Sequence, residues 1–159
     1  MYQSIYTGFI IIMAYKGVFR ARNTHKYKGD PTKIVYRSRW ELMVMQKLDE
    51  HPDVLEWSSE EVILKYRSPV DGKVHRYFPD FWVKKKDRTG KIIYDLIEVK
   101  PFNQTKPPTI QEGKPSRRYL NEVMTWGINS AKWTAAREYC KDRGWNFVII
   151  TEKELGLTF

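Results

Sequence analysis

The sequence predicts a mixed α/β fold with a central sheet that contains both antiparallel and parallel strands. Three observations predict this class. A helical pattern comes first, strand-like segments separated by turn signals follow it, and an apolar strand comes last, after a helical stretch. A strand reached through a helical crossover is expected to pair in parallel, whereas strands joined by tight turns pair antiparallel. The 159 residues suit one domain with a proper core.

The first predicted helix begins at Ser38, a residue type that caps helix N-termini. Val44, Met45 and Leu48 then recur at helical spacing, so one face of this helix should be buried. The helix is expected to end before His51, because a residue that precedes proline disfavours the helical conformation.

Three segments are expected to form an antiparallel meander after this helix. Residues 61–67 alternate between apolar and polar, as a half-buried strand does. Residues 76–83 and 94–100 also have the composition of strands. Asp71-Gly72 and Thr89-Gly90 mark the turns between them.

The C-terminal part is predicted to contain a loop, two helices and a buried strand. Residues 101–115 are rich in Pro, Lys and Gln and form the loop. Ser116 can cap one helix and Asn129 a second one, which Gly144 ends. Residues 147–151 are the strand expected to pair in parallel with the meander.

Asp80 and the Glu98-x-Lys100 pattern are the strongest candidates for a functional site. Side chains alternate along a strand, so Glu98 and Lys100 should share a face. Pro79 cannot donate a hydrogen bond to a neighbouring strand, so it should lie at the start, the edge or a bulge of its strand. We expect the local distortion to direct the Asp80 side chain toward Glu98. Carboxylates suit Mg²⁺, and a lysine can orient an attacking hydroxide or stabilise charge. The set predicts metal-dependent phosphodiester hydrolysis.

These motifs also have simpler explanations. Glu-x-Lys on a strand is often a solvated face with a weak ion pair, and Pro-Asp is often a turn. Ser38-x-x-Glu41 fits a capping box, in which the glutamate reaches back to the N-cap amide. Glu41 could instead assist the metal site as a further ligand.

The positive charge is concentrated near the N-terminus. The net charge is +9, and Lys16–Arg39 contains eight Lys or Arg residues with Asp30 as the only acid. Cations interleaved with aromatics favour binding to a phosphate backbone, although a solvated basic surface is the competing interpretation. The candidate DNA contacts are Arg20, Arg22, Lys26, Lys28, Arg37, Arg39 and Lys132.

Composition also excludes several classes and suggests a division of the chain. The single Cys140 allows no internal disulfide and no cysteine-rich zinc site. No phosphate-binding glycine motif is present, so no nucleotide cofactor is expected. The apolar run at residues 9–15 is too short to span a bilayer, and we expect no membrane contact. We expect residues 1–12 to be an N-terminal extension, residues 13–36 a basic arm, and residues 37–159 a single nuclease domain.

The ordered set of Glu41 on the first helix, Asp80 after proline and Glu98-x-Lys100 on the next strand resembles the PD-(D/E)XK, or restriction-endonuclease-like, superfamily. The distal part, from Asn129 to Glu152, is similar to TnsA-like transposition endonucleases. The runs Lys26 to Pro31, Tyr36 to Glu41 and Arg76 to Phe78 resemble the head completion nucleases of T-even-like tailed bacteriophages.

This resemblance implies a restriction-endonuclease-like core and a Mg²⁺-dependent DNA endo- or exonuclease, with Mn²⁺ as a substitute. By the match, Asp80 and Glu98 would hold the metal and Glu41 would assist. Lys100 would position the nucleophile or stabilise charge on the phosphate. The implied role is phage head completion and head-tail joining, with DNA and the phage head, portal or neck proteins as partners. The expected locations are the host cytoplasm during assembly and the head-tail junction of the virion.

Two other functions stay open on the sequence. A nuclease fold could be retained to grip a DNA end at the head-tail junction, as a structural protein whose catalysis is not essential. An RNA-directed or recombination nuclease could share the same fold, because fold does not determine function.

Overall fold

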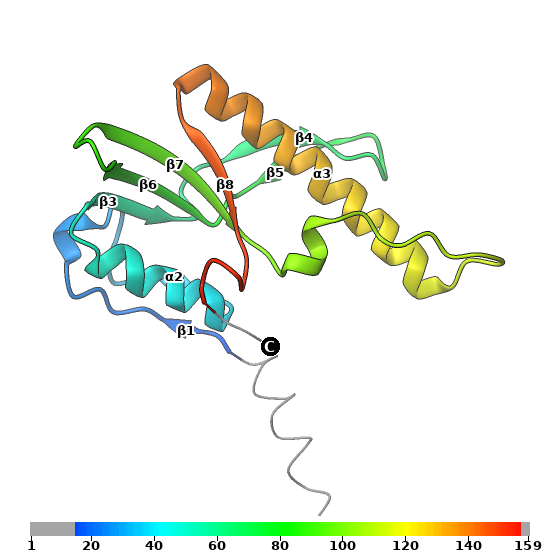
Figure 1. The fold of residues 1–159 in the computed structure, drawn as a ribbon, viewed down its shortest axis with the longest axis horizontal. Helices are drawn as coiled ribbons and strands as arrows, with labels where there is room; N and C mark the ends of the chain where they lie inside the picture. The colour runs from blue at the N-terminus through cyan, green and yellow to red at the C-terminus, as the bar shows by residue number, and fades with distance from the viewer. Residues whose placement is uncertain (1–14, 157–159) are drawn as a thin grey trace, which may run out of the picture.

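The computed structural model of the protein describes residues 15–156, so the predicted extension at residues 1–12 lies outside the described part (Figure 1). The elements in chain order are β1 (Gly17–Val18), the 3₁₀ helix η1 (Thr24–Lys26), β2 (Val35–Tyr36), α2 (Arg39–Glu50), β3 (Val54–Ser59), β4 (Leu64–Arg67), β5 (Val74–Tyr77), β6 (Phe81–Lys86), β7 (Ile92–Val99), the 3₁₀ helix η2 (Phe102–Thr105), α3 (Arg117–Arg143) and β8 (Asn146–Ile150).

The central sheet has the order β3-β6-β7-β8. β3, β6 and β7 pair antiparallel, and β8 pairs in parallel with β7. The long helix α3 supplies the crossover between β7 and β8, which is why the last strand can lie parallel to its neighbour. The mixed α/β class and the parallel final strand are therefore confirmed.

Two hydrophobic clusters cover opposite faces of this sheet. Phe81 and Ile97 belong to the cluster that contains α2, whereas their neighbours Trp82 and Leu96 belong to the cluster that contains α3. Adjacent strand residues point to opposite faces, so α2 and α3 lie on opposite sides of the sheet, as the ribbon also shows (Figure 1). The face covered by α3 is the one to which Glu98 points.

The meander differs from the prediction in its first strand. β3 is one of the two edge strands of this sheet, although its sequence, Val54-Leu55-Glu56-Trp57-Ser58-Ser59, shows little alternation. The predicted strand at 61–67 corresponds to β4, which leaves the sheet and pairs with β5 in a separate hairpin. The predicted strand at 76–83 was wrong as one element, because the chain passes from β5 to β6 through Phe78, Pro79 and Asp80. Pro79 lacks the N–H that a continuous ladder would need.

The two helices predicted between residues 116 and 144 are one helix. α3 runs for 27 residues, with Ser116 as its N-cap and Gly144, in the left-handed conformation, as its C-cap. Asn129, expected as a second cap, is a buried interior residue of α3. Gly127 continues the helix beside Pro69, whose ring lies 3.4 Å from where a side chain would begin. None of the helices within residues 15–156 is long and apolar enough to cross a membrane.

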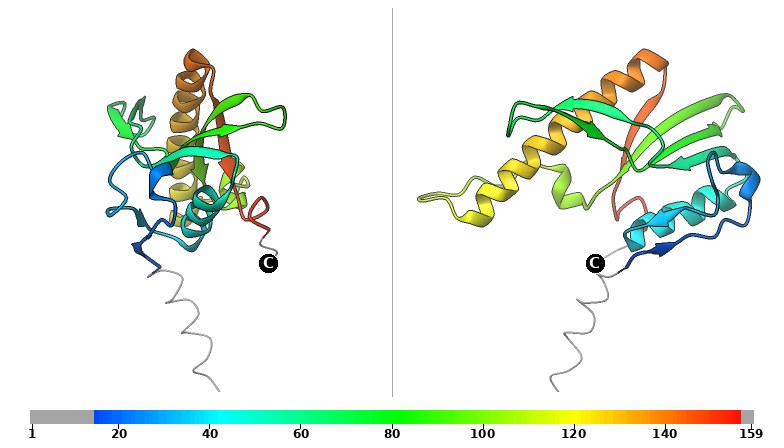
Figure 2. Two further views of the ribbon diagram at one scale, coloured as in Figure 1. Left: turned by 90° about the vertical axis from the view of Figure 1, so that its left-hand side faces the viewer. Right: turned by 180° about the vertical axis from the view of Figure 1, so that it is seen from behind.

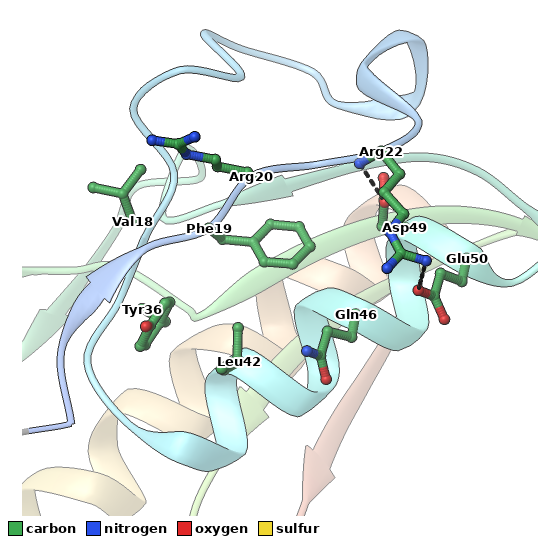
Figure 3. Close-up of a pocket in the computed structure, with 9 residues that line it drawn as sticks. All are labelled: Val18, Phe19, Arg20, Arg22, Tyr36, Leu42, Gln46, Asp49 and Glu50. Atoms are coloured by element: carbon green, nitrogen blue, oxygen red, sulfur yellow. Dashed lines mark hydrogen bonds and ion pairs between the residues drawn. The ribbon is translucent and has the colours of Figure 1, made fainter.

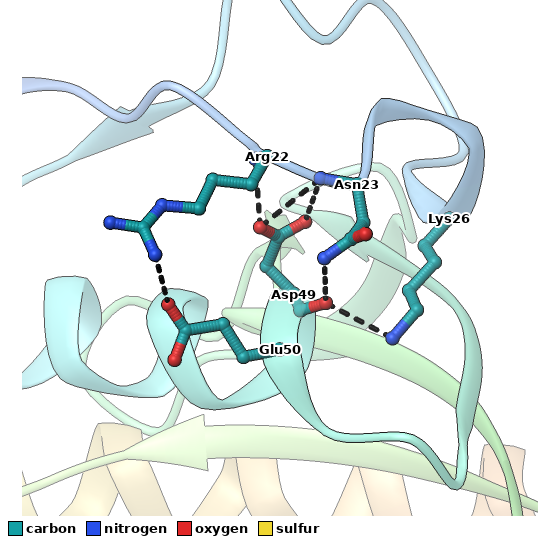
Figure 4. A network of polar contacts seen from close by, with 5 residues as sticks. All are labelled: Arg22, Asn23, Lys26, Asp49 and Glu50. Atoms are coloured by element: carbon teal, nitrogen blue, oxygen red, sulfur yellow. Dashed lines mark hydrogen bonds and ion pairs between the residues drawn. The ribbon is translucent and has the colours of Figure 1, made fainter.

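The segment expected as a basic arm is packed against the domain. Phe19, Tyr27 and Ile34 are buried in the same cluster as α2 and Trp57. The buried Asp49 carboxylate near the end of α2 accepts the backbone N–H groups of Arg22 at 2.8 Å and of Asn23 at 3.1 Å (Figure 4). Residues 15–36 therefore share one core with the rest of the described chain.

Candidate active site

Asp80 lies beside Glu98 because of the pairing between β6 and β7. The register pairs Phe81 with Ile97, so the residue before β6 lies level with the end of β7. The N–H of Val99 donates to Asp80 Oδ2 at 2.6 Å. The Lys100 N–H in turn donates to the carbonyl of Ile150 at 2.9 Å, which ties this end of β7 to β8. Two adjacent strands thus hold the two carboxylates together.

Glu98 and Lys100 share a face, as strand alternation predicted. Glu98 is only 4% exposed, and the Lys100 ammonium lies 3.1 Å from its Oε1 atom. The hydroxyl of the buried Tyr77 donates to Glu98 Oε2 at 2.7 Å. Tyr77 ends β5, so the β4–β5 hairpin supplies a direct contact to the site. Sequence reasoning missed this tyrosine. Its alternation with the exposed Arg76 could have indicated an inward side chain.

Glu41 makes part of the capping contact that the sequence predicts, and its carboxylate lies toward Asp80. Its N–H donates to the Ser38 hydroxyl at 3.1 Å, which is one half of the capping box. Its carboxylate accepts the N–H of Arg37 at 2.7 Å, in place of the N–H of Ser38 that the motif predicts. The same carboxylate is close enough to Asp80 to contribute to raising that residue's pKa.

The electrostatics of the site are dominated by carboxylates. Burial raises the pKa of Asp80 to about 8, with a further contribution from the charge of Glu98 and a smaller one from Glu41. The Val99 N–H and the Lys100 ammonium act in the opposite direction. Burial and the neighbouring Glu98 also raise the pKa of Tyr77, so its phenol stays protonated and acts as a donor. Glu98 and Glu41 thus add negative charge near Asp80, and Lys100 supplies the opposing positive charge.

This donor set fits a hard divalent cation by its chemistry. Carboxylate oxygens are the ligands that Mg²⁺ prefers. A cation would favour the ionised form of Asp80 against the burial and the repulsion that raise its pKa. Within residues 15–156 no three acidic, histidine or cysteine side chains are already gathered as a ligand cluster. Both oxygens of Glu98 are engaged, one by Tyr77 and one by Lys100. A carboxylate oxygen has more than one lone pair, so these contacts leave capacity for a further partner.

Arg37 and Glu60 form an ion pair at the edge of the site. This pair, with contributions from Glu41 and Asp80, raises the pKa of Arg37. Glu60 has a positive φ of 56°, and its N–H donates to the carbonyl of Asp80 at 3.1 Å. A non-glycine residue in this conformation is uncommon and often lies at functional sites. Glu60 was not predicted, and no local pattern in the sequence signals it.

Lys132, a predicted DNA contact, approaches the site from α3. Its ammonium lies 5.4 Å from the ring centroid of Tyr77 and 5.6 Å from that of Tyr66. Tyr77 is the residue that donates to Glu98. Of the seven predicted DNA contacts, Arg37 and Lys132 are thus the two with contacts that connect them to the site.

Three other predicted DNA contacts make internal contacts instead. Lys26 donates to the carbonyl of Asp49 at 3.0 Å, near the C-terminal end of α2 (Figure 4). It also donates to the carbonyl of His51 at 2.8 Å. Arg22 pairs with Glu50 at 3.5 Å. Lys28 pairs with Glu56 at 3.6 Å.

Arg20 and Arg39 are exposed. Arg20 and Arg22 line a cavity of about 280 Å³ between the N-terminal segment and α2 (Figure 3). Asp49 and Glu50 also line this cavity, and Arg22 contacts both of them, so the cavity carries both signs of charge (Figure 3).

Comparison with known proteins identifies the family of this chain. The family described as "TnsA-like endonuclease N terminal" matches residues 51–152, which include Asp80, Glu98 and Lys100. The head completion nuclease of Enterobacteria phage T4 is 40% identical over 150 residues, covering 90% of this chain and 95% of that protein. Both findings confirm the resemblance found in the sequence and support a nuclease role. The chain therefore belongs to the TnsA-like endonuclease family, within the restriction-endonuclease-like superfamily.

Proposed function

We propose that this protein is a metal-dependent deoxyribonuclease that hydrolyses phosphodiester bonds. The observation that carries the proposal is the adjacency of Asp80, Glu98 and Lys100, at the start of β6 and the end of β7. Glu41 of α2 is near enough to contribute to the raised pKa of Asp80. The excess of carboxylates over ammonium groups at this point has no evident structural benefit, because like charges in a partly buried site oppose folding. A divalent cation would supply the positive charge that this set of carboxylates lacks.

The roles follow from the contacts. Asp80 and Glu98 would hold Mg²⁺, or Mn²⁺ in its place, with Glu41 assisting. When bound, such an ion neutralises a nonbridging phosphate oxygen and lowers the pKa of water. The Val99 N–H fixes the orientation of Asp80, and Tyr77 fixes that of Glu98. Lys100 places a positive charge beside Glu98, where it can stabilise the phosphate or hold the nucleophile.

The biological setting is proposed from the relative. Because the phage T4 protein is named a head completion nuclease, we propose that this chain acts on DNA during phage head completion and head-tail joining. Its protein partners would then be head, portal or neck components. It would act in the host cytoplasm during assembly and at the head-tail junction of the virion.

The test is cleavage of linear and circular DNA by the purified full-length protein, with Mg²⁺, with Mn²⁺ and with EDTA. Asp80→Asn and Lys100→Ala should each lower the rate by about a hundredfold or more, because each removes a charge that acts at the reacting phosphate. Lys86→Ala is the matched control, since Lys86 is an exposed lysine at the far end of β6. Cleavage of circular DNA separates endonuclease from exonuclease activity.

Equal cleavage by the wild type and both site variants would contradict the proposal, as would full activity in EDTA. Phage assembly tests the competing structural role. If a folded, DNA-binding Asp80→Asn protein supports assembly as well as the wild type, the essential function is to grip DNA. If it fails, cleavage is essential.

A further inference from the structure

The outward face of the β4–β5 hairpin carries an unusual concentration of positive charge. Leu64 and Tyr77 pair with each other and are buried. Their neighbours Lys65 and Arg76 also pair with each other and are exposed on the other side of the hairpin. Arg67, two residues further along β4, is exposed on the same side. We call Lys65, Arg67 and Arg76 the outer hairpin cations.

The pairing of Lys65 with Arg76 is unfavourable in the free protein. Like charges directly opposite each other on neighbouring strands are destabilising, because their Cβ atoms are only about 5 Å apart. None of the outer hairpin cations forms an ion pair with an acidic side chain within residues 15–156. Arg67 donates to the carbonyl of Gly72 at 2.6 Å, and Arg76 lies 5.9 Å from the ring centroid of Phe78. The repulsion is therefore not relieved by a carboxylate.

The hairpin is joined directly to the candidate active site. Tyr77 follows Arg76 in β5 and donates to Glu98. The next residues, Phe78 and Pro79, lead to Asp80. The hairpin lies along α3, which contributes Lys132 above the ring of Tyr77 (Figure 2). Arg76 thus directly precedes the tyrosine that contacts Glu98, and it belongs to the same short segment as Asp80.

From this arrangement we propose that the outer hairpin cations bind the sugar-phosphate backbone of duplex DNA next to the point of cleavage. This inference rests on the proposed deoxyribonuclease function and assigns the DNA-binding surface for it. It differs from the contacts predicted from the sequence, because none of those seven residues lies on the β4–β5 hairpin. A phosphate between Lys65 and Arg76 would turn a repulsive pair into an attractive site.

The test uses Lys65→Gln/Arg76→Gln in the full-length protein. Binding to a fluorescent 20-base-pair duplex is measured by anisotropy in EDTA, so that no cleavage occurs, at several KCl concentrations. We expect Kd to rise about tenfold and the slope of log K against log salt to fall by about 2, since two phosphate contacts are lost. The melting temperature should stay level or rise, because the like-charge pair is removed.

The matched control is Arg88→Gln/Lys91→Gln. These two exposed cations lie in the turn between β6 and β7, at the opposite end of β7 from Glu98. The control removes the same charge and should leave Kd within about twofold and the salt slope unchanged.

The outcomes separate this inference from the proposed function. Equal losses of affinity in both double variants would show a general charge effect and overturn the hairpin site. An unchanged Kd in the hairpin variant, while the wild type still cleaves DNA with Mg²⁺, would overturn the hairpin site and leave the nuclease function intact. If the wild type neither binds nor cleaves DNA, both are overturned.

Discussion

Ionising the buried Asp80 carboxyl is unfavourable in the folded protein, as its raised pKa shows. We therefore expect Asp80→Asn to stabilise the protein in the absence of a divalent cation. Asparagine has nearly the same shape, and its carbonyl oxygen can still accept the Val99 N–H that now donates at 2.6 Å. The substitution removes only the capacity to ionise. A functional carboxylate in such a site is held at a cost to stability.

The size and the pH dependence follow from the pKa of Asp80. Its ordinary value of 3.8 applies to the unfolded chain, and the folded value is about 8. Between these values the folded state keeps the proton and the unfolded state has lost it, so stability falls as pH rises. The loss begins near pH 4 and is complete above about pH 8. At about 1.4 kcal/mol per pKa unit the upper limit is on the order of 6 kcal/mol, and partial solvent contact reduces the expected gain to about 2–3 kcal/mol at pH 8.

The assay is urea unfolding in EDTA at pH 4, 6 and 8, followed by tryptophan fluorescence. Asp80→Asn should match the wild type at pH 4 and exceed it increasingly at pH 6 and 8. Asp87→Asn is the control, because hydrogen bonds from Thr89 hold the pKa of that exposed carboxyl below its usual range. It should show no gain at any pH. A wild type as stable as Asp80→Asn at pH 8 would refute the electrostatic account of the site.

Three further substitutions test other parts of the structure. Tyr77→Phe removes the hydrogen bond to Glu98 and keeps the ring. The Mg²⁺ concentration for half-maximal cleavage should rise about tenfold, as for other residues that orient a metal ligand. An unchanged Mg²⁺ dependence would show that Tyr77 only packs. Asp49→Ala leaves the N–H groups of Arg22 and Asn23 without their buried acceptor and should cost about 2–4 kcal/mol in urea unfolding. Arg22→Ala removes only an exposed ion pair and should cost less than about 0.5 kcal/mol, so equal losses would refute this difference. Gly127→Ala should raise the free energy of unfolding by about 0.5–1 kcal/mol, because alanine favours the helix. Its Cβ would meet Pro69 at a contact distance of 3.4 Å. A lower melting temperature would contradict this prediction.

Local sequence patterns predicted the features that depend on residues close together in the chain. Ser38 marked the start of α2, and the apolar spacing of Val44, Met45 and Leu48 marked its buried face. Strand alternation placed Glu98 and Lys100 on one face. These features follow from backbone geometry over a few residues, so they can be predicted from the sequence alone.

Other features required the folded chain. β3 lacks clear alternation and is a strand because β6 lies beside it. α3 continues past Gly127 and Asn129 because packing outweighs their local tendency to interrupt a helix.

The composition of the site was also decided partly by tertiary structure. The sequence by itself determined the fold class, the family and the carboxylate and lysine set of the candidate site. Only the fold brought Tyr77 to Glu98 and Glu60 to Arg37, and only the fold engaged Lys26 at the end of α2. Each of these contacts joins residues more than 20 positions apart, and their partners depend on how strands and helices pack rather than on any local pattern.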